Sequence, residues 1–457
     1  MEKFCSKEDW EAVAKVKRVF EYFSLIPGFR DKFNENPQET LDELGLGVTV
    51  RDIAIVNKNP KDIYAIEAVN KGTIAETYVE FMKRKLEYRD QIRDLCKPAN
   101  EAMQKWRDRQ MSRGLIELGG KSSALIYTPL TIELADGCSV GCEFCGLRAG
   151  KLKSVFRYTE ENAKLFKGVL SKSKEIIGDA AGLGTLYFAS EPLDNPDYEK
   201  FLDDYYECFG IIPQITTATA AKHIDQLHNL LKKLNEDGRT IYRFSCLSQD
   251  IVETIFREFT PEETVLVEFL PQFEEAPSSN LINCGRNGDK NEEYDDTISC
   301  VSGFVVNMSR QTVRLTTPVR ASVEHPTGEI ILAEEHFDDV DDFEKVIKSL
   351  IRAHMMNIIK PSSKLRIYPY IKWKKTEDGF EFYRTEDGKV KLSTESSACE
   401  PLEQILDILK DKELTRREIV EQFLSDKDGI VVGSEYVFYL INKLWNLGLL
   451  EDLSGQV

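Results

Sequence analysis

Three cysteines lie within eight residues, at spacings of four and three, in the segment Cys138-Ser139-Val140-Gly141-Cys142-Glu143-Phe144-Cys145. Thiolates clustered this closely are ligands for zinc or for an iron–sulfur cluster. A structural zinc site needs a fourth ligand, usually from a second cysteine or histidine pair, but the next cysteine is the distant Cys208. Three ligands without a fourth predict a [4Fe–4S] cluster with one open iron, which could bind and reduce a small molecule. The alternatives are a structural zinc knot or three unrelated core cysteines.

The same segment resembles the signature of the radical SAM superfamily. Its CxxxCxxC spacing follows a strand-like apolar run, Leu125 to Leu134, and Phe144 precedes the last cysteine. The resemblance implies that Cys138, Cys142 and Cys145 hold the cluster. It also implies that S-adenosylmethionine chelates the open iron, with Phe144 near the adenine, and that a one-electron reductant such as a flavodoxin or ferredoxin is a partner.

Further short motifs lie where the superfamily binds S-adenosylmethionine. Ala189-Ser190-Glu191-Pro192 is similar to a GGEP-like motif, although Ala189-Ser190 replaces two glycines, and it implies that Ser190 and Glu191 bind the methionyl ammonium. By position, Thr217 in Thr216–Thr219, together with Arg243 and Ser245, resembles the ribose- and carboxylate-binding residues. For each residue the alternative is an ordinary polar side chain at a strand end.

Longer segments resemble a narrower family, the proteusin-type radical SAM epimerases that mature ribosomally made peptides. The likeness covers most of the chain from residue 20 to about 350, and it implies conversion of L- to D-residues within a precursor peptide that consists of a leader and a core. The segments that carry it are Asp136–Cys142, Phe156–Lys164, Glu191–Tyr198 and Cys300–Phe304.

Inversion at Cα removes hydrogen from one face and returns it to the other, and a neutral thiol is the best side-chain donor. One cysteine outside the cluster is therefore expected to line the cavity. Cys5 and Cys399 lie outside the predicted barrel, and a buried cysteine on a helix, as expected for Cys96 and Cys208, usually only packs. Cys300, near the start of the sixth predicted strand, is expected to be the donor, and Cys284 and Cys246 are the alternatives.

The elements that must position these residues are predicted by hydrophobic periodicity. Residues 1–122 are predicted to be a helical N-terminal region. Residues 123–360 alternate strands with helical stretches, which is typical of an α/β fold and predicts a partial (β/α)6 TIM-like radical SAM barrel. Its strand candidates are Leu125–Leu134, Gly184–Ala189, Pro213–Ala218, Ile241–Cys246, Val265–Leu270 and Ile298–Asn307, and the polar stretch Gln272–Asp296 is predicted to be a loop or lid.

Residues 361–457 are predicted to form a separate hairpin and winged-helix-like unit. It resembles the precursor-recognition modules of peptide-modifying enzymes, which implies that it binds the leader peptide as an added strand or in a helix-lined groove. The alternatives are a DNA-binding winged helix and a unit that only packs or dimerises. Six Lys/Arg against twelve Asp/Glu from Cys399 to Val457 disfavour DNA.

Composition sets wider limits. A net charge of −18 argues against nucleic acid or an anionic membrane as partner. Ten cysteines in 457 residues do not indicate a secreted disulfide scaffold, and no signal peptide or run of about 18 apolar residues is present. We expect a cytoplasmic enzyme.

The alternatives to epimerisation are another radical SAM peptide modification (thioether formation, methylation or backbone excision) and a non-catalytic peptide-binding regulator.

Overall fold

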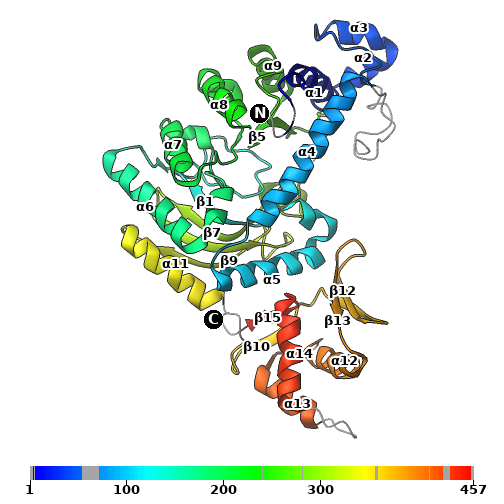
Figure 1. Cartoon of the computed structure of the whole chain (residues 1–457), viewed down its shortest axis with the longest axis vertical. Helices are drawn as coiled ribbons and strands as arrows, with labels where there is room; N and C mark the ends of the chain where they lie inside the picture. Colours follow the sequence, from blue (N-terminus) through cyan, green and yellow to red (C-terminus); the bar gives the residue numbers. More distant parts are fainter. Residues whose placement is uncertain are drawn as a thin grey trace.

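The computed structural model describes residues 4, 6–53, 72–238, 240–279, 281–355, 359–410, 412–425 and 433–453. Within these residues the chain is a mixed α/β protein with several separate sheets, none of which closes into a barrel (Figure 1). Cys5 lies outside the described residues.

The described residues before the first strand form helices joined by turns and short irregular segments, in agreement with the predicted helical region. In the first helix Trp10, Val13, Val16 and Phe20 are buried on one face, because a period of 3.6 residues brings them to the same side. The last helix of this region is capped by Asn100, whose side chain accepts the backbone N–H of Met103 at 3.1 Å. The helices are α1 (Trp10–Leu25), α2 (Phe29–Glu35), α3 (Pro37–Asp42), α4 (Ile74–Leu95) and α5 (Glu101–Leu118).

Parallel strands form the centre of the molecule and helices cover them (Figure 1). One parallel sheet has the order β4-β5-β6, and a second sheet has the order β1-β7-β8-β9, in which β1 and β7 are parallel. The strands are β1 (Thr128–Glu133), β4 (Thr216–Thr217), β5 (Tyr242–Cys246), β6 (Val267–Pro271), β7 (Val301–Asn307), β8 (Thr312–Pro318) and β9 (Glu329–His336). The helices between and after them are α6 (Glu160–Ile177), α7 (Tyr198–Phe209), α8 (Ile224–Asp237), α9 (Gln249–Glu258), α10 (Gly285–Asn291) and α11 (Val340–His354).

The prediction of a full strand at Gly184–Ala189 is wrong. This segment contributes a single parallel bridge from Thr185 to Gln214, and it meets β1 where Ile132 N–H donates to Thr185 O at 3.0 Å. The Thr185 hydroxyl instead donates to Tyr187 O at 2.7 Å and lies within hydrogen-bond distance of the Thr131 hydroxyl. Hydroxyls that bond to nearby backbone groups compete with the regular ladder.

The last predicted strand lies beside the first and not beside the fifth. β7 pairs with β1, with Thr128 opposite Val301 and Glu133 opposite Asn307. The order across the molecule is therefore β6, β5, β4, the Thr185 segment, β1 and β7. The long segment between β6 and β7 carries the chain from one edge of this array to the other, so the array stays open between these two strands.

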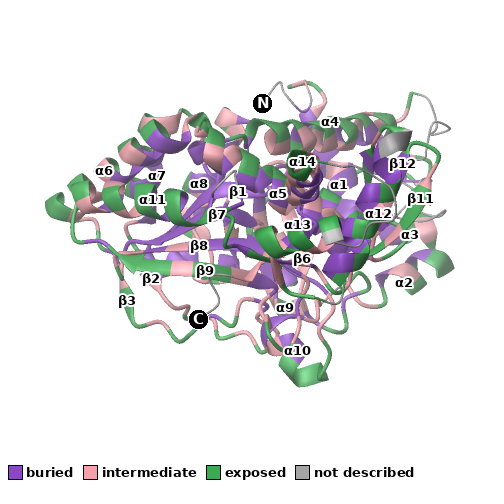
Figure 2. Ribbon diagram, turned by 90° about the horizontal axis from the view of Figure 1, so that it is seen from below, coloured by how far each residue is buried: buried purple, intermediate pink, exposed green. Residues whose placement is uncertain are grey.

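The paired strands β1 and β7 are buried along their whole length, as Figure 2 shows. Burial along the whole strand is typical of parallel strands that are covered on both faces. In the described part of the chain, none of the helices combines the length and apolar character needed to cross a bilayer.

The C-terminal part begins after α11 and has its own apolar core. The predicted hairpin forms as β12 and β13, and β11 adds a third strand at its edge. The predicted capping box also forms, because Thr415 N–H donates to Glu418 at 2.7 Å and Glu418 N–H donates to Thr415 at 3.2 Å. The elements are β10 (Lys364–Ile367), β11 (Lys372–Thr376), β12 (Gly379–Tyr383), β13 (Lys389–Ser393), α12 (Ser396–Lys410), β14 (Leu414–Thr415), α13 (Arg416–Ser425), α14 (Ser434–Asn446) and β15 (Leu450–Asp452).

Helix α5 connects this part to the rest of the molecule. Ile116 on α5 is buried within the core of the C-terminal part. The hydroxyl of Ser112 donates to Leu447 O at 2.7 Å, and the hydroxyl of Tyr370 donates to Glu117 at 3.2 Å. The C-terminal part therefore packs directly against the helix that leads into β1.

Candidate active site

The three predicted cluster cysteines lie on one loop that follows the C-terminal end of β1. The loop is closed at its base by the antiparallel strands β2 (Ala135–Asp136) and β3 (Ser154–Val155). Cys138 N–H donates to Gly150 O at 2.9 Å, and Leu152 N–H donates to Cys138 O at 3.2 Å. The thiols of Cys138, Cys142 and Cys145 are free and partly exposed, and Phe144 between them is also partly exposed.

The three thiols influence one another electrostatically. Burial raises the pKa of Cys142 to about 11, and the neighbouring Cys145 and Cys138 add to the shift. In residues that the structure describes, no three Cys, His, Asp or Glu side chains converge on a point that could hold a single metal ion. The thiolates of an iron–sulfur cube bind three different irons, so they need not converge on one point. A thiol-only donor set on one short loop fits such a cube.

A segment far along the chain holds this loop in place. Arg286, in α10, donates its backbone N–H to Cys145 O at 2.9 Å and its Nη1 to Cys142 O at 2.7 Å. Its Nη2 also donates to Ala149 O. Gly285 adopts φ +56°, and its backbone lies so close to the carbonyls of Cys145 and Gly146 that a side chain there would collide with them. The stretch Gln272–Asp296, predicted to be a loop or lid, thus contains the helix α10 and packs against the cysteine loop.

Cys284 lies next to the cysteine loop as a fourth thiol. Its sulfur faces Gly146 and the side chain of Ile298, and its side chain is fully buried. Burial raises the pKa of Cys284 to about 12. Cys284 therefore differs from Cys138, Cys142 and Cys145, whose side chains are partly exposed.

The Glu191 motif and the end of β4 come together beside the loop. The Glu191 carboxylate accepts the Thr217 hydroxyl at 2.6 Å, Ala218 N–H at 2.9 Å and Leu193 N–H at 3.2 Å. Burial raises the pKa of Glu191, and these hydrogen bonds oppose the shift. Ser190, directly before it, is partly exposed. Asp194 accepts Ser139 N–H at 2.9 Å, which ties this turn to the cysteine loop.

Glu133, the last residue of β1, is a buried carboxylate that the sequence analysis did not single out. It accepts Ala189 N–H at 2.7 Å and the Asn307 side-chain amide at 3.2 Å. Burial raises the pKa of Glu133, and Arg314 opposes the shift. Glu133 therefore joins the end of β1, the end of β7 and the start of the Glu191 turn.

Arg243 on β5 belongs to a row of three charged side chains that pair with one another. Its Nε donates to Glu268 at 2.9 Å, and Glu268 also pairs with Lys85 of α4 at 2.6 Å. Burial alone would raise the pKa of Glu268, but the charges of Lys85 and Arg243 outweigh it and hold that pKa well below its usual range. Ser245, two residues further along β5, is buried.

Arg243 and Glu268 lie deep among protein atoms, yet their side chains are 39% and 30% exposed. This combination describes side chains that line a water-accessible space inside the molecule. Tyr187, whose hydroxyl lies 2.6 Å from the Thr216 hydroxyl, is similarly deep and partly exposed.

Cys300 borders the same interior. It directly precedes β7, its carbonyl accepts Thr128 N–H at 2.9 Å, and its side chain is partly exposed. Burial raises the pKa of the Cys300 thiol, and nearby Arg243 partly offsets the shift. The alternative donors differ, because Cys246 and Cys284 are fully buried. Burial also raises the pKa of Cys246 to about 12.

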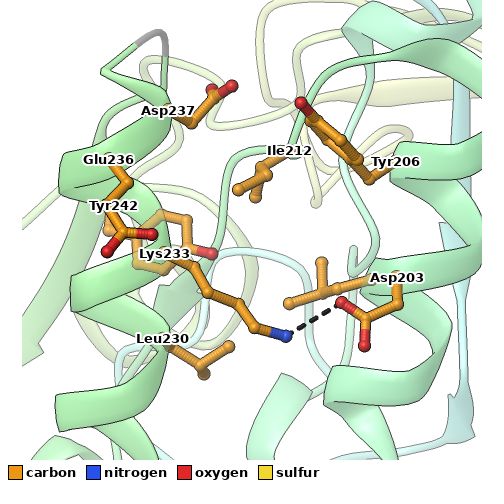
Figure 3. A pocket seen from close by; sticks show the side chains of 9 residues that line it. Asp203, Tyr206, Ile212, Leu230, Lys233, Glu236, Asp237 and Tyr242 are labelled. Atoms are coloured by element: carbon orange, nitrogen blue, oxygen red, sulfur yellow. Dashed lines mark hydrogen bonds and ion pairs between the residues drawn. The ribbon is translucent and has the colours of Figure 1, made fainter.

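A separate pocket of about 510 Å³ lies between α7 and α8 (Figure 3). Lys233 of α8 reaches across it to Asp203 of α7 at 2.9 Å. Its remaining lining residues are Leu202, Tyr206, Ile212, Leu230, Glu236, Asp237 and Tyr242. None of the site residues predicted from the sequence lines it.

The chain is 32% identical over 378 residues to the uncharacterized protein y4wI of Sinorhizobium fredii (strain NBRC 101917 / NGR234). The match covers 79% of this chain and 74% of that protein. The chain belongs to the y4wI family. No protein-family model matches the sequence.

Among solved structures, the crystal structure of BtrN in complex with AdoMet and 2-DOIA aligns with 50% of this y4wI-family chain and 82% of its own. The TM-score is 0.32 and the identity is 16%. At this level the similarity establishes neither a common fold nor a common activity.

The predicted site residues of this y4wI-family member fall into two groups. The cysteine loop, Ser190, Glu191 and Thr217 lie around the C-terminal ends of β1 and β4, whereas Arg243 and Cys300 lie near the N-terminal ends of β5 and β7. The sequence analysis missed Arg286, Lys85 and Glu268. An arginine inside the glycine-containing stretch Gly285–Gly288 was a signal for Arg286, but no local pattern marks Lys85 or Glu268.

Proposed function

We propose that this chain is a radical SAM enzyme that converts L- to D-residues in a ribosomally made precursor peptide, and that the parallel array of β1, β4, β5, β6 and β7 acts as a partial TIM-like barrel around the reaction. The observation that carries the proposal is the position of a neutral thiol, Cys300, at the end of the β1–β7 pair opposite the cysteine loop. An inversion needs a hydrogen donor on the face of Cα opposite the radical, because hydrogen leaves one face of Cα and returns to the other.

Cys138, Cys142 and Cys145 would hold the [4Fe–4S] cluster, and Phe144, Ser190, Glu191, Thr217 and Ser245 would contact S-adenosylmethionine. Arg243, which the sequence analysis assigned to the same role, lies instead near Cys300 at the N-terminal end of β5. When bound together, the cluster and S-adenosylmethionine supply the carbon radical that removes the Cα hydrogen. The Glu191 carboxylate already accepts three hydrogen bonds from the protein. Glu191 therefore supports this assignment by fixing the backbone near Ser190 and Thr217.

The chain itself contributes the hydrogen atom that completes the inversion. A thiol can donate a hydrogen atom only while it is protonated, and burial favours the protonated form of Cys300. Arg243, held by Glu268 and Lys85, lies near this thiol and can position a polar group of the peptide backbone beside it.

We further propose that the C-terminal unit acts as a winged-helix-like module that binds the leader of the precursor. β11 is an edge strand of its sheet, and an extended peptide can add to such an edge. Because Ile116 of α5 is part of this unit's core, truncation would expose an apolar face. A leaderless core peptide therefore tests the proposal better, and it should bind the intact chain at least about tenfold more weakly than the full precursor, a difference of about 1.4 kcal/mol.

Anaerobic purification followed by incubation with dithionite, S-adenosylmethionine and precursor tests the proposed function. We expect a brown protein that contains iron and sulfide, releases 5′-deoxyadenosine and forms D-residues. Radical chemistry without D-residues would favour another peptide modification. A colourless protein that contains zinc, or one that binds peptide without cleaving S-adenosylmethionine, would contradict the proposal and favour a regulator.

A further inference from the structure

The three-stranded sheet β11-β12-β13 carries positive charge in a chain whose net charge is −18. Its strands contain five lysines and one acidic residue, Glu381. The nearby acidic residues lie in the two turns that join the strands, and they are Glu377, Asp378, Glu386 and Asp387. The strands therefore form a basic patch on a strongly acidic protein.

The strand register places four of these lysines on one face of the sheet, and they are Lys372, Lys374, Lys389 and Lys391. Lys374 and Lys391 lie opposite Glu381 on its two neighbouring strands. Lys372 and Lys389 lie opposite Tyr383 in the same way, and side chains two residues apart on a strand share a face. Phe380 and Phe382, on the opposite face, are buried in the core of the C-terminal part. We call the outward side the lysine face.

The lysine face keeps an excess of positive charge after its own ion pairs are counted. Glu381 pairs with Lys374 at 2.9 Å and with Lys391 at 3.1 Å, so two ammonium groups share one carboxylate. Lys389 pairs with Glu386 of the adjoining turn at 2.5 Å. Within the described part of the chain, Lys372 makes no ion pair. Four lysines against two carboxylates leave two positive charges for an anionic partner to neutralise.

β11 is an edge of this sheet, and one side of its backbone has no strand partner among the described residues. An extended peptide that adds to such an edge lies about 4.8 Å away, with its side chains opposite those of the edge strand. The other edge strand, β13, packs against α5. The turn before β13 is also fixed to the end of α5, because Gly120 N–H donates to Asp387 at 3.0 Å. β11 is therefore the more open edge.

The residue between the two outward lysines of β11 adds an apolar surface at the same edge. Trp373 lies opposite Phe382, on the face that packs against α12, and is partly exposed. Lys410 of α12 lies over its ring at 5.8 Å, and Lys375 pairs with Glu403 of α12 at 3.1 Å. The edge thus presents a lysine, an aromatic ring and a second lysine at consecutive positions.

We propose, on the basis of the proposed function, that the leader of the precursor binds along β11 as an added strand through an acidic–apolar–acidic triplet. The two carboxylates face Lys372 and Lys374, and the apolar side chain faces Trp373. Cross-strand pairs of opposite charge, and of an aromatic with a β-branched side chain, stabilise such pairing. A nucleic acid fits this surface less well, because Glu381 lies in the middle of the lysine face and the whole chain carries a charge of −18.

Binding of the fluorescein-labelled leader to the intact chain tests this inference at about 0.15 M salt, where the Debye length is about 8 Å. One variant carries Lys372→Gln and Lys374→Gln on β11, and its matched control carries Lys389→Gln and Lys391→Gln on β13. Each variant removes two charges from the same two rows of the lysine face. The β13 lysines lie two strands, roughly 10 Å, further from the added strand, so screening hides most of their effect.

We expect the β11 variant to bind the leader about tenfold more weakly than the wild type, and the β13 variant to bind within about twofold of it. A leader whose two triplet acids are replaced by their amides should bind the wild type as weakly, and should lose nothing further in the β11 variant. The leader should also slow amide hydrogen exchange in β11 and not in β13.

Equal losses in both variants, or protection of β13 in place of β11, would overturn this assignment. A leader that lacks the triplet, that does not bind the wild type, or that binds both variants normally would leave the lysines only the role of keeping an edge strand from aggregating. Tighter, lysine-dependent binding of a short single-stranded DNA would identify a nucleic acid as the occupant. Leader binding with the expected lysine dependence but without D-residues would refute the proposed reaction and leave this inference intact.

Discussion

Cys300 and Cys138 lie at opposite ends of the same pair of parallel strands. Cys300 O accepts the N–H of Thr128, the first residue of β1, whereas Cys138 follows the last residue, Glu133, on the loop beyond it. The six residues of β1 span roughly 20 Å at about 3.3 Å per residue. A peptide held between these ends could lose hydrogen on the side of the cysteine loop and regain it on the side of Cys300.

Replacement of the proposed donor should separate the two halves of the reaction. Cys300→Ala should still cleave S-adenosylmethionine in the presence of precursor, but it should lower D-residue formation by at least about 100-fold, the lower range for loss of a positioned proton or hydrogen donor. Liquid chromatography of hydrolysed peptide and of 5′-deoxyadenosine measures both products. Cys246→Ala is the control, because this thiol is fully buried, and it should retain epimerisation. Normal epimerisation by Cys300→Ala would show that another group donates.

The ratio of D-residue to 5′-deoxyadenosine should depend on pH through this thiol. Burial raises the pKa of Cys300 above that of a free thiol, so the neutral donor form persists past about pH 8.5 and is lost only as the pH rises through the higher folded-state pKa. We expect a constant ratio from neutral pH to about 8.5 and a decline above it. Single-turnover assays across this range would measure the ratio, and a decline that begins below pH 8 would contradict the environment described for Cys300.

Arg286 should determine how firmly the cysteine loop keeps its cluster. Arg286→Gln removes the charge and the pair of hydrogen bonds to Cys142 O and Ala149 O. Loss of an outer-shell partner typically costs about 10- to 100-fold in metal affinity, and we expect a loss of that size in iron retained against a chelator. Arg286→Lys, which keeps the charge, should be affected less.

The control for this prediction is Arg148→Gln. Arg148 lies on the same loop and pairs with Asp289 at the surface, so its replacement should leave iron retention nearly unchanged. Equal iron retention by the Arg286→Gln variant and the wild type would show that the contacts of Arg286 do not stabilise the bound cluster.

Cys284 is expected to be unnecessary for the cluster although it lies beside the loop. Its thiol is buried against Gly146 and Ile298, so Cys284→Ala should retain iron and the EPR signal of the reduced cluster. Cys142→Ala should lose both. If Cys284→Ala lost iron as completely as Cys142→Ala, the site would have four cysteine ligands and no open iron.

Helix α5 should stabilise the C-terminal unit. Ile116→Ala removes a fully buried side chain from the core of that unit and should lower the free energy of unfolding by about 2–5 kcal/mol. Urea denaturation measures the change. Leu424→Ala, at a partly exposed position on α13, should cost less than about 0.5–1 kcal/mol. Similar losses for both variants would argue against a shared core between α5 and the C-terminal unit.

Local features were predictable from the sequence because short-range physics determines them. The spacing of the cysteine loop, the periodic buried face of α1 and the Thr415–Glu418 capping box depend on neighbouring residues, and all three are present in the structure. Glu191 and Thr217 were both assigned to one predicted binding site, and they are hydrogen-bonded to each other although the segment before Glu191 is not a full strand.

The features that were not predicted depend on contacts between distant residues. The pairing of β7 with β1 depends on how the long segment after β6 crosses the molecule. Arg286 meets Cys142 across 144 residues of sequence, and Lys85 meets Glu268 from a helix whose own pattern indicates only packing. The positive φ of Tyr127 requires the buried Arg107, which no turn motif at Tyr127 indicates.

Turnover of the precursor in deuterated water tests the central claim most directly, because the Cys300 thiol exchanges its hydrogen with solvent whereas the Cα hydrogen does not. The account predicts one deuterium at the Cα of every newly formed D-residue and none at unmodified residues, as mass spectrometry of the peptide would show. D-residues that carry no deuterium at Cα would contradict hydrogen donation from the thiol of Cys300 at the N-terminal end of β7.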